Sequence, residues 1–295
     1  MTPIHPVTRH STEMLLRNIS SNDHEWQRVL RQALRGLFGG CLSLLACGCA
    51  TTYPPAIGIP LRAPPLRSVV SPSSPIQTIV IDAGHGGHDP GTSHYGLKEK
   101  SLALDIAKRL RDHLRAAGFT TVMTRESDHF IPLSGRPDVA NRLQADLFIS
   151  VHINANRNRK ISGVEVYYPR QSVVSSSAGW PPSILPEEIA APSTTVRDMV
   201  WDLVLGRTRV QSRRLASCIC RSMRRGLQVP CHGTKPARFV VLREAWMPAV
   251  LVEVGYVTNR AEAGRLGNAE YRQATAESIA GGVLSYAREL GAEHL

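Results

Sequence analysis

Residues 79–91 read Ile-Val-Ile-Asp-Ala-Gly-His-Gly-Gly-His-Asp-Pro-Gly. The apolar β-branched residues at the start are typical of a buried strand, and the glycines that follow allow a tight turn. His85 lies in this turn, just past the carboxyl end of the strand, where α/β sheets usually bind their ligands. The stretch therefore predicts a rigid strand that presents an imidazole to a substrate.

Strand and helix patterns alternate through the chain from residue 76 onward. Helices are predicted from residue 97 to Gly118 and at 133–143, 197–226 and 271–290. Short apolar runs predict strands at 76–82, 120–124, 146–152, 163–168, 239–242 and 248–256. This alternation predicts an α/β fold in a single catalytic domain, 76–295. The sheet is expected to be twisted and mostly parallel or mixed, with helices on both faces.

The chain is strongly basic. Its 295 residues carry a net charge of +11, with a pI near 9.8. Five arginines and three acidic residues fall within the first 49 residues, so about +9 of this charge lies beyond them. A basic domain favours an anionic partner. The sequence shows no zinc finger, RNA-binding signature or basic-aromatic stripe, so we expect no nucleic-acid partner. Anionic wall polymers and lipid headgroups both fit the charge.

Residues 1–49 are predicted to be an export signal. Three arginines between residues 28 and 35 precede about a dozen mostly apolar residues, too few to span a membrane as a mature helix. The run ends at residues 44–47 in Leu-Leu-Ala-Cys, which resembles a bacterial lipoprotein cleavage box with lipid attached to Cys47. Cys49 is the alternative lipidation site, and Met14 is an alternative start. An ordinary signal peptide or an uncleaved anchor are the other interpretations.

Residues 50–75 are rich in proline and serine and show little periodicity, which is typical of an extended tether. A tether would let a lipid-anchored domain reach its substrate. The two N-terminal segments together predict an exported protein of the periplasm or cell envelope, attached to a membrane through lipid.

Three cysteines late in the chain allow two interpretations. Cys218, Cys220 and Cys231, with the adjacent His232, could bind a metal, although residues two apart on a helix do not face the same way. The alternative, which we favour, is a single disulfide or buried thiols.

Four ionisable residues lie at strand ends or just past them, and such ends gather at one edge of an α/β sheet. His85, Glu99 and His152 would suffice to hold a catalytic zinc and leave a position for water. Glu253, which follows an apolar run, could then act as general base and later as general acid in amide hydrolysis.

Each of these residues also has a structural interpretation. A histidine at a strand end is often structural, and Glu99 could simply favour the helix dipole. A carboxylate that ends an apolar strand, as Glu253 does, is costly to bury without a partner. His88 and His94 also flank the site, and we interpret them as loop residues on the solvent side.

The chain resembles the zinc-dependent N-acetylmuramoyl-L-alanine amidases of the Amidase_3 type, which act on bacterial cell walls. Four ordered motifs carry the resemblance, and they lie at residues 81–87, 96–100, 150–155 and 251–259. Residues 123–125 with Asp128, Arg136 with 140–141, and 271–282 also fit. The resemblance covers 76–295 apart from an insertion. Ala83 stands where relatives commonly carry proline, which affects only the rigidity of the turn.

The resemblance implies a function and a site. The family cleaves the amide bond between N-acetylmuramic acid and L-alanine in peptidoglycan, during wall remodelling or cell separation. One zinc ion per chain would be bound by His85, Glu99 and His152. Glu253 would be the catalytic carboxylate, and Asn154 would lie beside the site as a substrate-binding residue.

The insertion, about 169–207, lies between the predicted strand at 163–168 and the helical segment near Arg213. By the resemblance, this is the interval in which some family members carry an additional helix. Some members of the family that act in cell separation hold an inhibitory helix across the zinc until a partner protein removes it. We hypothesise that part of the insertion covers the site, with Glu187 or Glu188 as an extra zinc ligand and an activator protein as a partner. The alternative is a solvated loop rich in proline and serine.

Three other functions are alternatives to a cell-wall amidase. A non-catalytic peptidoglycan-binding or regulatory protein of the same fold would be expected to lack a ligand or Glu253, and all four residues are present. A zinc peptidase that cuts within stem peptides would use the same metal chemistry. A nucleic-acid binder would leave the export signal without a purpose.

Overall fold

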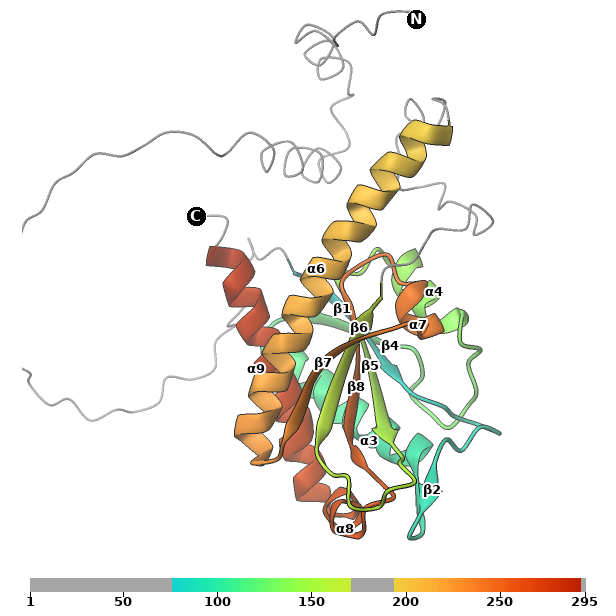
Figure 1. Ribbon diagram of the computed structural model, residues 1–295, viewed down its shortest axis with the longest axis vertical. Helices are drawn as coiled ribbons and strands as arrows, with labels where there is room; N and C mark the ends of the chain where they lie inside the picture. The colour runs from blue at the N-terminus through green and yellow to red at the C-terminus, as the bar shows by residue number, and fades with distance from the viewer. Residues whose placement is uncertain (1–75, 171–193, 293–295) are drawn as a thin grey trace, which may run out of the picture. The chain divides into compact units, whose positions relative to one another are not determined.

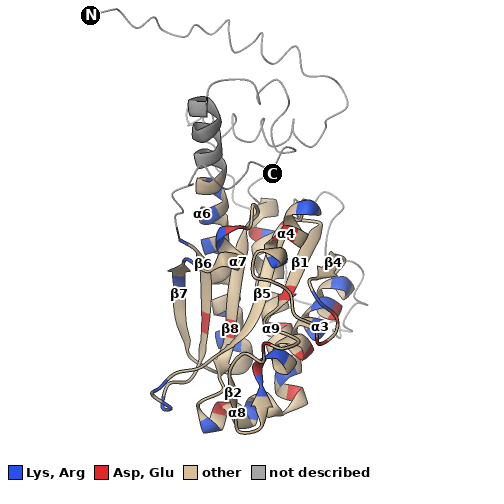
Figure 2. Ribbon diagram, turned by 90° about the vertical axis from the view of Figure 1, so that its right-hand side faces the viewer, with Lys and Arg blue, Asp and Glu red and all other residues tan. Residues whose placement is uncertain are grey.

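A six-stranded sheet forms the centre of the computed structural model, which describes residues 76–170 and 194–292 (Figure 1). Figure 2 shows the strands side by side. From one edge to the other they are β4 (Thr120–Met123), β1 (Thr78–Ala83), β5 (Leu147–Asn154), β8 (Ala249–Tyr256), β6 (Val164–Pro169) and β7 (Cys231–Ala237). All neighbouring pairs are parallel except β8 and β6, which are antiparallel. The predicted mixed sheet is therefore confirmed.

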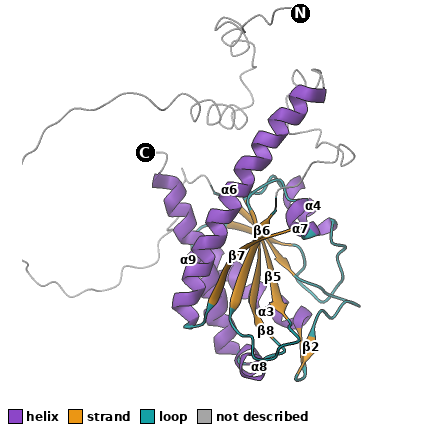
Figure 3. Cartoon of the chain, in the orientation of Figure 1, coloured by secondary structure: helices purple, strands orange, loops and turns teal. Residues whose placement is uncertain are grey.

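Helices cover both faces of the sheet (Figure 3). One face packs against the long helices α3 (Glu99–Ala116), α6 (Thr194–Leu227) and α9 (Ala269–Ala292). Within the described ranges, the other face carries the short helices α4 (Gly135–Arg142) and α7 (Val240–Arg243). Helix α8 (Arg260–Gly267) follows β8, and β2 (Ser93–His94) pairs with β3 (Leu97–Lys98) in a small separate hairpin. The α/β fold class predicted from the sequence is confirmed.

The alternation of side chains along β8 determines where the site can form. Val250, Val252 and Val254 point into the core beneath the long helices. Ala249 and Leu251 point to the opposite core, beneath α4 and α7. Because successive side chains alternate between faces, the next residue on that second face is Glu253. The second core therefore ends before the carboxyl ends of the strands, where polar side chains take its place.

The prediction of a strand at 239–242 is wrong, because residues 240–243 form helix α7. Val241 and Leu242, which are consecutive, are both buried in the second core, while Phe239 is exposed. A short apolar run does not distinguish one helical turn from a strand. Strand β7, whose residues include glycine, proline and lysine, is not among the strands predicted from the sequence. Such residues are tolerated because β7 is an edge strand.

Some predictions fall on residues outside the described ranges. The N-terminal segments 1–49 and 50–75, with Cys47 and Cys49, and residues 171–193 of the insertion, with Glu187 and Glu188, are among these. The final part of the insertion is helical, because α6 begins at Thr194. Among the described residues, the helices are too short or too polar to cross a membrane.

Cys220 at the inner face of α6 and Cys231 at the start of β7 form a disulfide. Cys218 is buried and free, with its Sγ 3.1 Å from Arg221 Nη2. The interpretation favoured from the sequence, a single disulfide or buried thiols, is thus confirmed, since one disulfide and one buried thiol are present in the described ranges. No metal-binding group within these ranges includes the three cysteines.

We expect Cys220→Ser to lower the free energy of unfolding by about 2–3 kcal/mol, because the disulfide closes a short loop and restricts the unfolded chain. Urea denaturation with and without a reductant measures this. The reductant should destabilise the wild type and leave the variant unchanged. Cys218→Ser serves as the control, and an equal loss of stability in that variant would contradict the assignment.

Candidate active site

The turn after β1 places His85 in an uncommon backbone conformation. Its φ is 60°, in the left-handed region, and Gly86 and Gly87 that follow also have positive φ. A histidine there is strained unless its surroundings hold it. Its Nδ1 lies 2.7 Å from the Asp89 carboxylate, which fixes the ring and directs Nε2 towards the sheet edge.

Two buried arginines hold this turn through its carbonyl groups. Arg136 of α4 donates to Asp82 Oδ1, to the carbonyl of Ala83 and to the carbonyl of His85, at 3.0, 2.8 and 2.8 Å. Arg125, which follows β4, donates to the carbonyls of Ala83 and Gly84 at 2.9 and 2.7 Å. Both arginine side chains are almost completely buried. They fix the path of the chain on either side of the imidazole.

Glu99, the first residue of α3, brings the two histidines together. Its Oε1 lies 3.1 Å from His85 Nε2 and 3.0 Å from His152 Nδ1. The backbone N–H groups of Thr92 and Ile153 donate to its two carboxylate oxygens at 2.9 and 3.0 Å. Ligand atoms of His85, Glu99 and His152 therefore lie within 4.8 Å of one another.

This arrangement keeps Glu99 ionised. Burial opposes the charged carboxylate, but hydrogen bonds and charge from His152 and His85 outweigh it and hold the pKa of Glu99 well below its usual range. For His85, burial lowers the pKa, while Glu99 and Asp89 raise it more, so its pKa lies above the usual value. An ionised carboxylate between two imidazoles is a donor set suited to a divalent cation.

The donor set fits zinc by its chemistry. Zinc prefers nitrogen and oxygen donors of this kind, and catalytic sites supply three protein ligands. Asp89 on His85 provides the outer carboxylate that usually orients a metal-binding histidine. The three residues could therefore hold a metal ion, with a fourth position left for water or substrate.

Glu253 lies beside this group on the neighbouring strand. It is paired with His152 across β5 and β8, so both side chains point to the same face. Its Oε2 is buried and has no hydrogen-bond partner among the described residues. Burial, and then the charges of Glu99 and Glu165, raise the pKa of Glu253 well above its usual value. A carboxyl group with a raised pKa and a free oxygen is suited to accept and return a proton.

A second carboxylate, Glu165 of β6, lies opposite Glu253 in the antiparallel register. It accepts hydrogen bonds from Asn154 Nδ2 at 3.2 Å and from the Tyr167 hydroxyl at 2.5 Å. Lys235 of the edge strand β7 forms an ion pair with its Oε1. Burial works against ionisation, but Lys235 and the tyrosine donors lower the pKa of Glu165. Glu165 therefore stays charged where Glu253 is driven towards protonation.

The structure thus brings His85, Glu99, His152 and Glu253 to one edge, with Asn154 beside them. His88 lies outside this group and stacks on Phe130, with ring centroids 4.2 Å apart. Asp89 and Glu165 are not among the site residues predicted from the sequence. Asp89 could have been noticed, because it lies four residues after His85 in the same glycine-rich turn.

Gly84 is the position at which one added methyl group would disturb the site most. A Cβ there would overlap the His152 ring and lie 2.6 Å from its Nδ1. We expect Gly84→Ala to weaken zinc binding by about 10–100-fold, as changes that misplace a ligand typically do. Competition with a chromophoric chelator measures the affinity. Gly264→Ala in α8, where a Cβ meets open space, is the control. Equal affinities of the two variants would show that His152 is not a ligand.

The fold and this group define a class of protein, an α/β domain with a candidate metal centre at the carboxyl edge of its sheet. The family model described as N-acetylmuramoyl-L-alanine amidase, Amidase_3, matches residues 79–285. The chain therefore belongs to the Amidase_3 family of N-acetylmuramoyl-L-alanine amidases. It is a hydrolase with peptidoglycan amidase activity.

Similarity to individual amidases supports this family membership. The chain is 36% identical over 222 residues to the N-acetylmuramoyl-L-alanine amidase AmiA of Escherichia coli K12, across 71% of this chain and 76% of that protein. A crystal structure of the amidase from Clostridium difficile 630 is similar with a TM-score of 0.57 and 30% identity, over 72% of this chain and 96% of that one. The structure of the amidase AmiC2 of Nostoc punctiforme is similar with a TM-score of 0.56 and 33% identity, over 72% of this chain and 97% of that one. The predicted family and fold are confirmed.

Proposed function

We propose that this protein is a zinc-dependent amidase of the cell envelope that cleaves the bond between N-acetylmuramic acid and L-alanine in peptidoglycan, in wall remodelling or cell separation. The observation that carries the proposal is the meeting of His85, Glu99 and His152 beside the unpartnered carboxyl oxygen of Glu253. We assign the first three as ligands of one zinc ion and Glu253 as the catalytic carboxylate.

When bound, zinc supplies Lewis-acid chemistry, which polarises a carbonyl and lowers the pKa of water to about 7. The protein supplies the proton transfer. Glu253 Oε2 can accept a proton from the attacking water and return it to the leaving amine, since none of the residues that the structure describes forms a hydrogen bond with it. Glu165, held by Lys235 and Tyr167, stays charged and favours the protonated state that Glu253 must pass through.

The remaining residues position the reacting groups. Asp89 orients the His85 ring, and the N–H groups of Thr92 and Ile153 fix the Glu99 carboxylate. Asn154, proposed to contact substrate, is held by its Nδ2 against Glu165. Its position next to His152 on β5 places it at the same edge of the sheet.

Mass spectrometry of peptidoglycan fragments tests the reaction. The full chain is incubated with zinc and intact peptidoglycan. Release of stem peptides that begin at L-alanine supports the amidase. Cuts within the stem would instead identify a peptidase, and binding without cleavage by a zinc-loaded protein would identify a regulatory protein. Deletion of residues 172–195, measured in parallel, tests whether the insertion inhibits the enzyme. If the insertion covers the site, the deletion should raise the rate of peptidoglycan hydrolysis, and a search for an activator protein would then be justified.

Export and lipid attachment belong to the same proposal. A structural disulfide between Cys220 and Cys231 suits an oxidising compartment outside the cytoplasm. The N-terminal signal and tether suit attachment of lipid to Cys47, with Cys49 as the alternative. Metabolic labelling with an alkyne fatty acid distinguishes them, because label should be lost in Cys47→Ser and kept in Cys49→Ser. Label in neither wild type nor variants would refute the anchor.

A further inference from the structure

Most of the excess positive charge of the chain lies on one helix. Residues 205–227, the part of α6 whose side chains the structure describes, contain seven arginines and no lysine, aspartate or glutamate. This segment therefore carries +7 of the net +11, and all other residues carry +4 between them. The basic character of the protein is concentrated at α6, marked in Figure 2.

Five of these arginines are exposed and share one side of the helix. We call them the arginine face: Arg207, Arg213, Arg221, Arg224 and Arg225. Their spacing places them on one side of an α-helix, and the opposite side buries Leu215, Ile219 and Met223 in the core. With a rise of about 1.5 Å per residue, the face extends for about 27 Å.

The arginine face is poorly neutralised. Among the described residues, one of the five has an acidic partner, since Arg221 Nη2 lies 3.0 Å from Glu289 Oε1 of α9. A cluster of guanidinium groups without counter-charges is unfavourable by itself, and an external polyanion would relieve it. Its composition of arginine without lysine matches phosphate recognition, because the guanidinium group binds phosphate oxygens in a bidentate manner.

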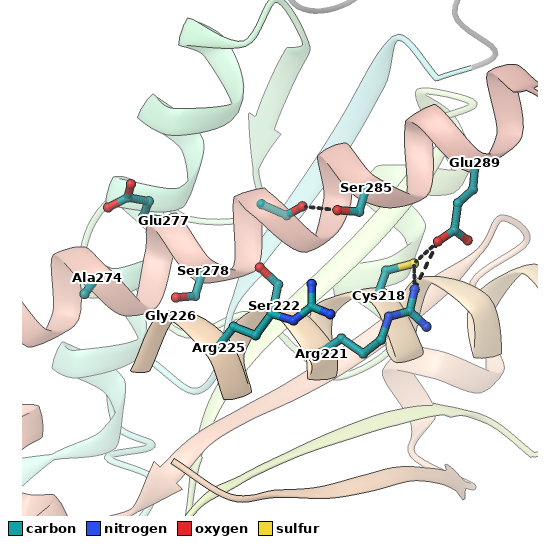
Figure 4. Close-up of a pocket in the computed structure, with 11 residues that line it drawn as sticks. Cys218, Arg221, Ser222, Arg225, Gly226, Ala274, Glu277, Ser278, Ser285 and Glu289 are labelled. Atoms are coloured by element: carbon teal, nitrogen blue, oxygen red, sulfur yellow. Dashed lines mark hydrogen bonds and ion pairs between the residues drawn. The ribbon is translucent and has the colours of Figure 1, made fainter. Parts of the chain in front are cut away.

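A groove between α6 and α9 continues the face (Figure 4). Its lining includes two cations, three hydroxyl groups and two carboxylates: Arg221, Arg225, Ser222, Ser278, Ser285, Glu277 and Glu289. In Figure 4 the side chains of Arg221 and Arg225 extend from α6, and Glu289 of α9 points towards Arg221. The groove therefore presents cations on its α6 side, carboxylates on its α9 side and hydroxyl groups between the two helices.

We propose that the arginine face of α6, with this groove, docks on the phosphates of an anionic phospholipid membrane. Each basic side chain near such a surface strengthens binding, and several act together. Val210 lies within the same stripe and is 55% exposed, so an apolar side chain accompanies the cations. A lipid surface can bind the cations at its phosphates and the valine at its acyl chains, whereas a polyanionic glycan or nucleic acid offers no comparable apolar layer.

The position of the face fits this partner. α6 packs on the sheet face covered by long helices, whereas His85, Glu99 and His152 lie at the carboxyl edge of the strands. A domain docked through α6 would keep that edge open to wall polymer. Docking does not depend on the proposed lipid at Cys47, but the two signals together would give stable attachment where one alone is marginal.

Vesicle flotation tests the proposal with the full chain. Wild type is compared on neutral phosphatidylcholine vesicles and on vesicles in which a quarter of the lipid is phosphatidylglycerol. The face variant replaces four arginines with glutamine: Arg207, Arg213, Arg224 and Arg225. The matched control removes four exposed charges elsewhere: Arg157, Arg159, Lys160 and Arg260. Because all eight side chains are exposed, both variants should fold. Thermal denaturation followed by circular dichroism verifies this.

We expect wild type and control to bind anionic vesicles at least about tenfold more tightly than neutral ones, and the face variant to lose this difference. High salt should abolish this preference for anionic vesicles in wild type and control. Equal binding of face variant and control, or no preference of wild type for anionic lipid, would overturn the proposal. Retention on insoluble cell wall that depends on the arginine face, without vesicle binding, would overturn it in favour of a wall polymer.

Discussion

Glu253→Gln is expected to lower the rate of peptidoglycan hydrolysis by about 10²–10⁴-fold, the usual contribution of a general acid–base group. The amide of glutamine has nearly the same shape but cannot accept and return a proton. The carboxyl oxygen that the reaction needs, Oε2, has no hydrogen-bond partner among residues 76–170 and 194–292. The loss should fall on kcat, because the substrate and the metal ligands keep their positions.

The same substitution should leave the free energy of unfolding unchanged or slightly higher. Burial and the nearby charges of Glu99 and Glu165, which raise the pKa of Glu253, also make its ionised form costly in the folded state. An amide carries no such cost. Zinc content and urea denaturation separate the two effects, and the exposed Glu277→Gln is the control. A Glu253→Gln protein that retains zinc and hydrolyses at the wild-type rate would remove Glu253 from the mechanism.

The meeting of the candidate ligands could be predicted from the sequence because it depends on local signals. His85 follows the end of β1, His152 lies near the end of β5, and parallel strands place such ends at one edge of the sheet. Glu99 begins the helix that follows the first strand, so the chain cannot carry it far from His85. In the structure β1 and β5 are direct neighbours, so Glu99 contacts both His85 and His152.

The surroundings of the ligands could not be predicted in the same way. Glu165 and Lys235 are 70 residues apart and meet only because β6 and β7 are neighbours, and β7 has a composition that does not indicate a strand. Charged residues are rarely buried, so nothing in the sequence marks Arg125 or Arg136 as internal. Their burial depends on which carbonyl groups the folded turn leaves without partners.

Arg136→Met is expected to lower the free energy of unfolding by about 3–5 kcal/mol, because it leaves a buried carboxylate without its cation. Asp82 is fully buried, and its Oδ1 lies 3.0 Å from Arg136 Nη1. Methionine fills similar space but offers no hydrogen bond to Asp82 or to the carbonyls of Ala83 and His85. Arg142→Met, in the same helix but largely exposed and paired with Asp138 at the surface, should change stability by less than about 1 kcal/mol.

A second consequence separates the positioning role of Arg136 from a purely structural one. The carbonyl of His85 is held by Arg136 Nη2 at 2.8 Å while the backbone of His85 has a positive φ. Loss of that bond should weaken zinc affinity by about 10–100-fold even under conditions where the variant is fully folded. The double variant Asp82→Asn with Arg136→Met should recover part of the stability, since the carboxylate no longer needs a cation. It should not recover the zinc affinity, because the His85 carbonyl is still released. Recovery of both would mean that Arg136 only balances the charge of Asp82, and that the turn holds its histidine without help.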